Sequence, residues 1–349
     1  MKKIIVAPLN WGLGHATRCV PIINSLLKNG FVPILASDGD SLEFLQQEFP
    51  NLDSIELSTY NISYGKNVQW SLLKQTPFIL KAIKKENAII ADFIFKNKDV
   101  IGIISDNRFG VRSDKIFSVY ITHQINVLSG NTTFFTSKIH QKYINQFNEC
   151  WVPDTSNSEF SGKLSQSKKV YIPTKFIGVL SRFKKDNLPQ NIDVLIILSG
   201  PEPNRSDLEK KLIVEFLDFK GNVVLVKGKV EKEQKTHQEK NIKIYNYVLS
   251  SELQNLINSS KLIICRSGYS SIMDLAVLEK KVFFIPTKNQ AEQEYLARLH
   301  QEKMKVSFST EKNFTLKKLS EVKNYKGLKS KETELDAELF SLFHGKRKL

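Results

Sequence analysis

Two glycine turns, one near each end of the chain, carry the residues best suited to chemistry. The first, over 10–18, reads Asn-Trp-Gly-Leu-Gly-His-Ala-Thr-Arg and follows the apolar run 4–7. The second, over 266–271, reads Arg-Ser-Gly-Tyr-Ser-Ser and follows the apolar run 262–265. A strand, a glycine turn and a helix start together expose backbone N–H groups and a positive dipole end to an anion. Two such sites predict a cleft between two similar domains.

The first turn offers a candidate base. Gly12 and Gly14 allow a tight turn and close approach of a ligand, and His15 opens the next helix. The helix dipole at that position favours a neutral imidazole, which is the form that a general base requires. A histidine that only caps or lines the helix start is the alternative, and the local sequence leaves both interpretations open.

The second turn has the composition of a phosphate site. Arg266 adds a fixed positive charge, and Asp274, one turn further along the expected helix, is placed to accept hydrogen bonds from ribose hydroxyls. An ordinary favourable charge near a helix start is the alternative for Asp274. The residues that offer hydroxyl or backbone N–H groups to a phosphate are Ser267, Gly268, Ser270 and Ser271.

Length and composition favour a two-domain globular protein of the cytoplasm. The 349 residues exceed one ordinary core, and 41% hydrophobic with 25% charged residues is typical of soluble domains. No apolar run approaches the ~18 residues of a membrane helix. The three cysteines lack metal-ligand spacing and cannot all pair, which favours a reducing compartment.

The chain is strongly basic, with a formal net charge of +15. Residues 151–349 hold 35 basic and 24 acidic side chains and so contribute +11 of it. Such an excess suits an anionic nucleotide donor, an anionic membrane surface or nucleic acid. The sequence has no zinc-finger spacing, no RNP-like motif and no basic recognition helix, so we expect no nucleic-acid partner.

Strand-like and helix-like stretches alternate twice along the chain, which predicts two doubly wound α/β domains. We expect an N-terminal domain over 1–178, a linker over 179–191, a C-terminal domain over 192–331, and a helix with a basic tail over 332–349. Residues 229–240 are charged and lack an apolar stripe, so we expect an exposed loop there.

The segments 265–276, 282–286 and 290–297 together resemble the donor-site half of family 28 glycosyltransferases, which include the lipid II-forming N-acetylglucosaminyltransferase and the galactolipid synthases. The turn with Gly12 and Gly14 resembles the acceptor-side loop of the same group. This resemblance implies the GT-B fold, two Rossmann-like domains facing across a cleft, and a nucleotide-sugar donor, most often UDP-linked, with no metal and no other cofactor.

The resemblance also implies roles for individual residues. His15 matches the base or transition-state stabiliser, and Asp274 matches the acidic residue that holds the ribose. Glu292 and Gln293 match the pair that reads the hydroxyls of the donor sugar. The remaining donor-side matches are Ser199, Gly200 and Arg205 in the loop after the first strand of the second domain, Tyr247 and Val248 near the base, and Arg266, Ser267, Gly268, Ser270 and Ser271 at the diphosphate.

The first half contains a further motif, Asp-Asn-Arg-Phe-Gly over 106–110, followed by Thr-His-Gln over 122–124. With the Gly-x-Gly-His-Ala-x-Arg start, it resembles a less characterised bacterial branch of GT-B transferases more closely than the lipid II enzyme. Both segments follow strand-like runs, so Asp106, Arg108 and His123 are acceptor-side candidates. Loop capping is the alternative for each.

The expected function is transfer of a hexose or N-acetylhexosamine from a nucleotide donor to an acceptor hydroxyl with inversion. The acceptor stays open between a lipid-linked molecule and a glycan, and a lipid-linked acceptor would give the basic excess a use at the inner face of an anionic membrane. Two alternatives stay open: a UDP-sugar 2-epimerase-like enzyme, and a non-catalytic protein that binds nucleotide-sugars or polyanions.

Overall fold

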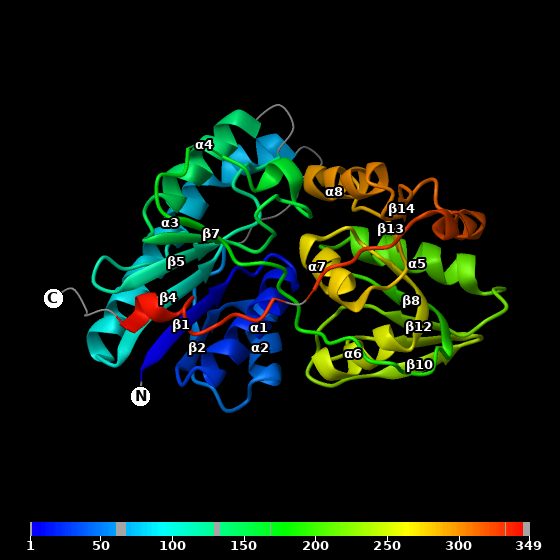
Figure 1. Cartoon of the computed structure of the whole chain (residues 1–349), viewed down its shortest axis with the longest axis horizontal. Coiled ribbons are helices and arrows are strands. Elements are labelled where there is room, and N and C mark those ends of the chain that lie inside the picture. The colour runs from blue at the N-terminus through cyan, green and yellow to red at the C-terminus, as the bar shows by residue number, and fades with distance from the viewer. Residues whose placement is uncertain (1, 61–67, 129–132, 168, 332, 345–349) are drawn as a thin grey trace. The chain divides into compact units, whose positions relative to one another are not determined.

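The computed structural model describes residues 2–60, 68–128, 133–167, 169–331 and 333–344 (Figure 1). The chain divides into two compact units. Unit 1 comprises Met1–Trp11, His15–Gly178 and Glu334–Leu349, and unit 2 comprises Gly12–Gly14 and Val179–Thr333. None of the helices in the described ranges is both long enough and apolar enough to cross a membrane.

Unit 1 is built on a parallel sheet of seven strands in the order β3-β2-β1-β4-β5-β6-β7. Its strands are β1 (Lys3–Pro8), β2 (Val32–Ser37), β3 (Ser54–Glu56), β4 (Val100–Asp106), β5 (Phe117–Ile121), β6 (Glu149–Val152) and β7 (Thr174–Phe176). Its helices are α1 (Gly14–Lys28), α2 (Gly39–Glu48), α3 (Val68–Lys96), α4 (Thr133–Ile144) and the 3-10 helix η2 (Gly162–Leu164).

The buried strands of unit 1 explain why the sheet is parallel. In β4 the side chains of Ile103 and Ile104 point to opposite faces, and both are fully buried. Successive residues of a strand face opposite sides, so this strand is covered on both faces, as in doubly wound folds. Ile103 packs in one core with Ile5 of β1 and Ile90 of α3. The predicted α/β class is confirmed.

Unit 2 repeats this plan with a sheet in the order β10-β11-β9-β8-β12-β13-β14. Its strands are β8 (Ile192–Ile197), β9 (Val223–Val226), β10 (Thr236–Glu239), β11 (Ile242–Tyr245), β12 (Ser260–Cys265), β13 (Val282–Phe284) and β14 (Ser307–Phe308). Its helices are α5 (Asn204–Phe216), α6 (Ser250–Asn258), α7 (Tyr269–Leu278), α8 (Ala291–Glu302) and the 3-10 helix η3 (Leu316–Asn324).

The expectation of a loop over 229–240 is wrong for its last residues. They form β10, which pairs antiparallel with β11 at the edge of the sheet. All four β10 side chains are exposed, so no apolar alternation marks the strand in the sequence. Backbone hydrogen bonds to β11 alone specify it.

The expected C-terminal helix is also corrected. The described residues 333–344 form turns and a short 3-10 helix, η4 (Ser341–His344), which packs against β4 of unit 1 (Figure 1). Phe340 and Phe343 are fully buried, and a Cβ on Gly102 would meet the Phe343 ring at 2.2 Å. Residues three apart are eclipsed in a 3-10 turn, which lets both rings enter the core together. The predicted basic tail lies outside the described residues.

Candidate functional site

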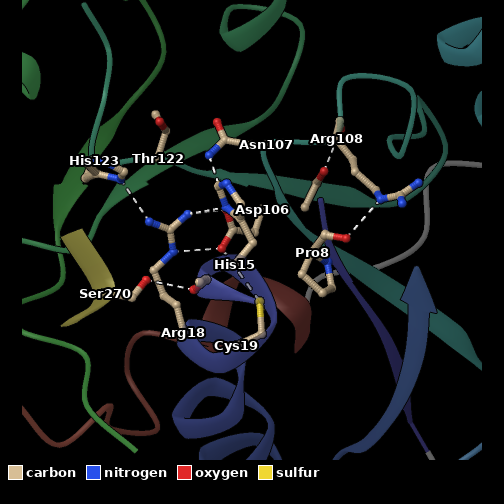
Figure 2. Close-up of polar contacts among 12 residues, drawn as sticks. Pro8, His15, Arg18, Cys19, Asp106, Asn107, Arg108, Thr122, His123 and Ser270 are labelled. Carbon is tan, nitrogen blue, oxygen red and sulfur yellow. Dashed lines mark hydrogen bonds and ion pairs between the residues drawn. The ribbon is translucent and has the colours of Figure 1, made fainter. Parts of the chain in front are cut away.

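Three neighbouring strands of unit 1 end at one edge of its sheet and position the first site. The turn with Gly12 follows β1, Asp106 is the last residue of β4, and His123 follows β5. Gly12 has φ +75°, a left-handed conformation in which a side chain would be strained. The turn delivers His15 to the first residues of α1 (Figure 2).

His15 contacts a buried carboxylate. Its Nδ1 lies 2.9 Å from Oδ1 of Asp106, whose side chain is 0% exposed against 16% for His15. The ring donates to the carboxylate when Nδ1 carries the proton, which leaves the Nε2 lone pair able to accept another proton. A base role for His15 stays a prediction at this point.

Arg18 holds the same carboxylate from the next turn of α1. Its Nε donates to Asp106 Oδ2 at 2.7 Å, and its Nη2 donates to Oδ1. Burial by itself would raise the pKa of Asp106, but the Arg18 charge, aided by His15, holds it well below its usual range. Asp106 therefore stays ionised at any physiological pH.

Asn107 contacts both His15, with its Nδ2 3.5 Å from Nδ1, and Asp106. It has φ +58° and donates from Nδ2 to Asp106 Oδ1 at 3.3 Å. The hydroxyl of Tyr120 donates to Asn107 Oδ1 at 2.9 Å. Tyr120 is fully buried and stacks on Phe109, so the amide is oriented by the core of the unit.

Arg108 points the other way from Asp106 and serves the fold. Its side chain is 0% exposed, and its Nε donates to the Pro8 carbonyl at 2.9 Å. The same guanidinium forms ion pairs with Asp38 and Glu86. Pro8 is the last residue of β1, Asp38 directly precedes α2, and Glu86 lies in α3. Arg108 therefore ties these segments together, contrary to the expectation that it faces an acceptor.

The second site is the start of α7 in unit 2. Gly268 precedes the helix in an extended conformation, and a Cβ built on it has no heavy atom of the described chain within 4 Å. Ser267 is buried and donates to the Gln293 carbonyl at 2.7 Å. Ser270 lies in the first turn of α7. The open side of the turn is thus formed by backbone around Gly268.

The loop after β13 is linked to the start of α7 through Gln293, which contacts both Ser267 and Thr287. Gln293 accepts a hydrogen bond from the Thr287 backbone N–H at 2.8 Å, so its amide oxygen fixes the loop. The Thr287 hydroxyl is buried, and within the described part of the chain it has no hydrogen-bond partner. A Cβ on Gly200 would lie 3.6 Å from that hydroxyl. Gly200, Thr287 and Gln293 therefore gather at one corner of unit 2.

The two arginines expected near the donor are occupied within the fold. Arg266 donates to the carbonyls of Asn204, at 2.9 Å, and Ile285, at 3.1 Å, and pairs with Glu311. Arg205 pairs with Glu202 and Glu209. Since these bonds use their charged heads inside unit 2, neither arginine presents the free charge that the sequence led us to expect.

Asp274 is engaged as well. It accepts a hydrogen bond from Ser181 Oγ at 2.8 Å. Burial raises the pKa of its carboxyl to about 6, although Arg182 and the Ser181 hydroxyl act in the opposite direction. A carboxylate kept in such a position at a cost in stability is more often functional than an exposed one.

Comparison with known proteins agrees with this architecture. Residues 205–338 match the Glycosyltransferase family 28 C-terminal domain. The glycotransferase of kitacinnamycin superposes with a TM-score of 0.62, over 99% of this chain and 93% of that chain, at 13% identity. Residues 205–338 thus form a family 28 C-terminal domain, and the chain has the GT-B fold.

Two further solved structures share the GT-B fold. A UDP-glucosyltransferase from Polygonum tinctorium gives a TM-score of 0.61 over 98% of this chain and 92% of its own, at 12% identity. MurG of Acinetobacter baumannii gives 0.52 over 93% of each chain, also at 12% identity. At these identities the likeness concerns the fold alone.

One curated relative matches in sequence. It is the UDP-N-acetylglucosamine--N-acetylmuramyl-(pentapeptide) pyrophosphoryl-undecaprenol N-acetylglucosamine transferase of Buchnera aphidicola subsp. Schizaphis graminum (strain Sg). The two are 25% identical over 182 residues, or 51% of this chain. The match spans about half the length of that relative, 48%.

The remaining predicted donor-side residues lie after strands or in helices of unit 2. Within the described residues, no group of three or more His, Cys, Asp or Glu side chains is arranged to hold a metal ion. The remaining residues are Ser199 after β8, Tyr247 and Val248, both buried, after β11, Ser271 in α7, and Glu292 in the first turn of α8.

Sequence reasoning gave no role to two residues of this GT-B chain. Arg18 lies three residues after His15, a spacing that places both residues on one face of a helix. This spacing could have identified Arg18 as a neighbour of His15. Thr287 follows the buried strand β13 by three residues. This position indicates which edge of the sheet carries the residue, but the sequence gives no sign that its buried hydroxyl lacks a hydrogen-bond partner among the described residues.

Proposed function

We propose that the chain transfers a hexose or N-acetylhexosamine from a UDP-sugar to an acceptor hydroxyl, with inversion at the anomeric carbon. The observation that carries the proposal is the contact of His15 Nδ1 with the ionised, buried Asp106 in a chain with a family 28 C-terminal domain. This contact prepares Nε2 to take a proton from a hydroxyl.

In this mechanism His15 removes the acceptor proton as the acceptor oxygen forms its bond to the anomeric carbon. The bond from that carbon to the diphosphate oxygen breaks, and the electron pair leaves with UDP. A single displacement inverts the configuration. The leaving diphosphate gains charge, and the N–H groups at the start of α7 are suited to stabilise it.

The donor part of the proposal rests on three features of unit 2. Space beside Gly268 permits close approach of a diphosphate to backbone N–H groups. The buried Thr287 hydroxyl is suited to a hydrogen bond with the donor. Asp274 is suited to the ribose hydroxyls, and Glu292 with Gln293 to the sugar.

Calorimetry with UDP, GDP, dTDP and their sugar conjugates tests the donor site. Gly268→Ala is the sharpest variant, because the added methyl group enters open space and leaves the fold intact. We expect UDP-selective binding by the wild type and about tenfold weaker binding by Gly268→Ala, equivalent to ~1.4 kcal/mol. An exposed substitution in η3, Ser320→Ala, is the control. Absence of binding across the panel would overturn the proposal.

A second assay separates transfer from its alternatives. The wild type is incubated with the bound UDP-sugar and pools of glycan and lipid-linked acceptors, and UDP release and sugar products are followed. Transfer or slow hydrolysis supports the proposal. Formation of the 2-epimer, or UDP binding with no turnover in any pool, would contradict it.

We extend the proposal to the cytoplasm and to contact with anionic membrane, on the basis of the +11 charge in residues 151–349. Co-sedimentation with vesicles tests this contact. We expect binding to vesicles with phosphatidylglycerol that weakens with added salt. Equal binding to neutral vesicles would contradict the electrostatic explanation.

A further inference from the structure

The end of β1, which leads into the first glycine turn, is held from two sides. On the side of β4, the Leu9 N–H donates to the Asp106 carbonyl at 2.9 Å. The Pro8 carbonyl accepts a hydrogen bond from Arg108 Nε, also at 2.9 Å (Figure 2). On the side of β2, the Ser37 hydroxyl donates to the same Pro8 carbonyl at 2.8 Å. The backbone is therefore fixed by hydrogen bonds up to Leu9.

Asn10, the next residue, links the turn to the start of α2 through its side-chain amide. Its Nδ2 donates to Asp38 Oδ2 at 3.2 Å, and its Oδ1 accepts from the Ser41 N–H at 3.4 Å. This orientation agrees with the chemistry of the amide, because Nδ2 only donates and Oδ1 only accepts. A carboxyl group and a backbone N–H together determine which way the amide points.

The glycine that opens α2 leaves room for this amide. Gly39 has φ +49°, and a Cβ built on it would lie 2.5 Å from Asn10 Nδ2. Non-bonded atoms do not approach so closely, so a side chain at this position would push the amide away from Asp38. The contact between Asn10 and Asp38 thus depends on a glycine at position 39.

Asp38 joins Asn10 to Arg108. Its side chain is buried, and its Oδ1 accepts a hydrogen bond from Arg108 Nη2 while its Oδ2 accepts from Asn10. Arg108 Nε in turn binds the Pro8 carbonyl. The contacts therefore close a ring from Pro8 through Arg108 and Asp38 to Asn10, two residues further along the chain. Such a network of buried, charge-assisted hydrogen bonds resists displacement of its members.

We propose that Asn10 and Asp38 are positioning residues that fix the first glycine turn and thereby the place of His15. Asp106 contacts the ring of His15, whereas Asn10 and Asp38 hold the backbone that delivers it. The inference rests on the proposed function for the role of His15 as a base. A base must lie within hydrogen-bond reach of the acceptor hydroxyl, and a displacement of about 1 Å can lower the rate about 100-fold.

An exchange of the two side chains tests the pair. Asn10→Asp replaces the Nδ2 donor, 3.2 Å from Asp38 Oδ2, with a second carboxylate oxygen, so the two side chains repel each other. Asn10→Asp combined with Asp38→Asn restores the match between donor and acceptor. The new amide at position 38 can donate to the new carboxylate at position 10 and still accept from Arg108. The double variant also keeps the formal charge of the wild type.

Steady-state kinetics and calorimetry measure the effect on the reaction. Asn10→Asp should lower kcat for transfer roughly 10- to 100-fold and leave the dissociation constant for UDP within about twofold, because the donor residues lie in unit 2. The double variant should recover most of the lost kcat. Asn51→Asp adds the same charge at an exposed turn and should match the wild type. An unchanged kcat in Asn10→Asp, a parallel loss of UDP affinity, or no recovery in the double variant would overturn the inference.

Hydrogen–deuterium exchange of the full chain, followed by mass spectrometry, examines the turn without any substrate. The N–H groups of Leu9 and Trp11 are both hydrogen-bonded to backbone carbonyls. We expect their exchange to be roughly tenfold faster in Asn10→Asp and close to the wild type in the double variant. Equal exchange in all three proteins would overturn the inference. The expected exchange in a chain that neither binds UDP nor transfers sugar would support the fixing of the turn and overturn only the proposed function.

A milder variant keeps the test decisive if Asn10→Asp does not fold. Asn10→Ala removes both hydrogen bonds of the amide and adds no charge. We expect kcat to fall and the exchange at Leu9 and Trp11 to rise, each by about fivefold. Wild-type values of kcat and of exchange in this variant would overturn the inference.

Discussion

The two glycine turns share a backbone plan but differ in what surrounds them. Around His15 the first turn gathers ionised side chains, with Asp106 and Arg18 buried beside the ring. At Gly268 the second turn presents backbone and neutral hydroxyls, and the neighbouring Arg266 is bound to carbonyls and Glu311 inside the unit. A proton transfer needs side chains that titrate, whereas a diphosphate is held well by backbone N–H groups. We interpret the difference as a division of labour.

The largest expected effect separates the two turns by kinetics. His15→Ala should lower kcat by roughly 10²- to 10⁴-fold, because it removes the proposed general base. The dissociation constant for UDP should stay within twofold of the wild type, since the variant leaves the start of α7 intact. Steady-state kinetics with calorimetry checks both values, and His15→Gln is the control for size. Loss of UDP binding in either variant would contradict the assignment of chemistry to the first turn and donor binding to the second.

Arg266→Met tests whether the arginine of the second turn is structural. The substitution leaves Glu311 without its buried partner, so the free energy of unfolding should fall by about 3 kcal/mol. Denaturant unfolding measures this loss, and the double variant with Glu311→Leu should regain part of it. In the folded protein the UDP affinity should be unchanged. A selective loss of affinity would restore the expectation that Arg266 binds the diphosphate.

Asp274→Asn gives a pH-dependent effect on stability. With its pKa raised to about 6, the folded chain takes up a proton below pH 6, before the unfolded chain does near pH 4. The free energy of unfolding therefore falls as the pH rises from 4 to 6, and the full loss is reached above pH 6.

We expect the Asn variant to be more stable than the wild type by about 2 kcal/mol at pH 8 and equally stable at pH 3.5. Urea unfolding at the two pH values measures the difference. UDP binding should weaken in the same variant. Equal stability of the two proteins at pH 8 would show that burial of the ionised Asp274 carboxylate does not destabilise the fold. Unchanged UDP binding would show that Asp274 does not belong to the donor site.

Thr287→Val is expected to have the smallest effect. The valine keeps the shape of the side chain and removes a buried hydroxyl that lacks a partner among the described residues, so the fold should lose nothing. If the hydroxyl binds the donor, UDP affinity should fall by about 1 kcal/mol, roughly fivefold. Thr287→Ser keeps the hydroxyl and should restore binding. Equal affinity in all three proteins would remove Thr287 from the site.

Local patterns were sufficient for much of the fold. Apolar runs without alternation indicated parallel strands, as in β4, and glycine turns after the first strand of unit 1 and after 262–265 indicated the two helix starts. Residues 236–239 lacked any such signal, because an exposed edge strand is specified by the backbone of its neighbour. The pairing of Phe343 with Gly102 was equally hidden, since it joins residues 241 positions apart in the printed sequence.

For the candidate site as well, some features follow from the sequence and others only from the tertiary structure. The sequence by itself determined the types of residue and the sheet edge that carries them, because residues after parallel strands share one edge. Only the tertiary structure decided which charges are satisfied inside the fold. Arg18 and Arg108 are both buried arginines of unit 1, yet one contacts His15 and the other binds the Pro8 carbonyl, Asp38 and Glu86. Long side chains reach several partners, and burial determines which of them are available.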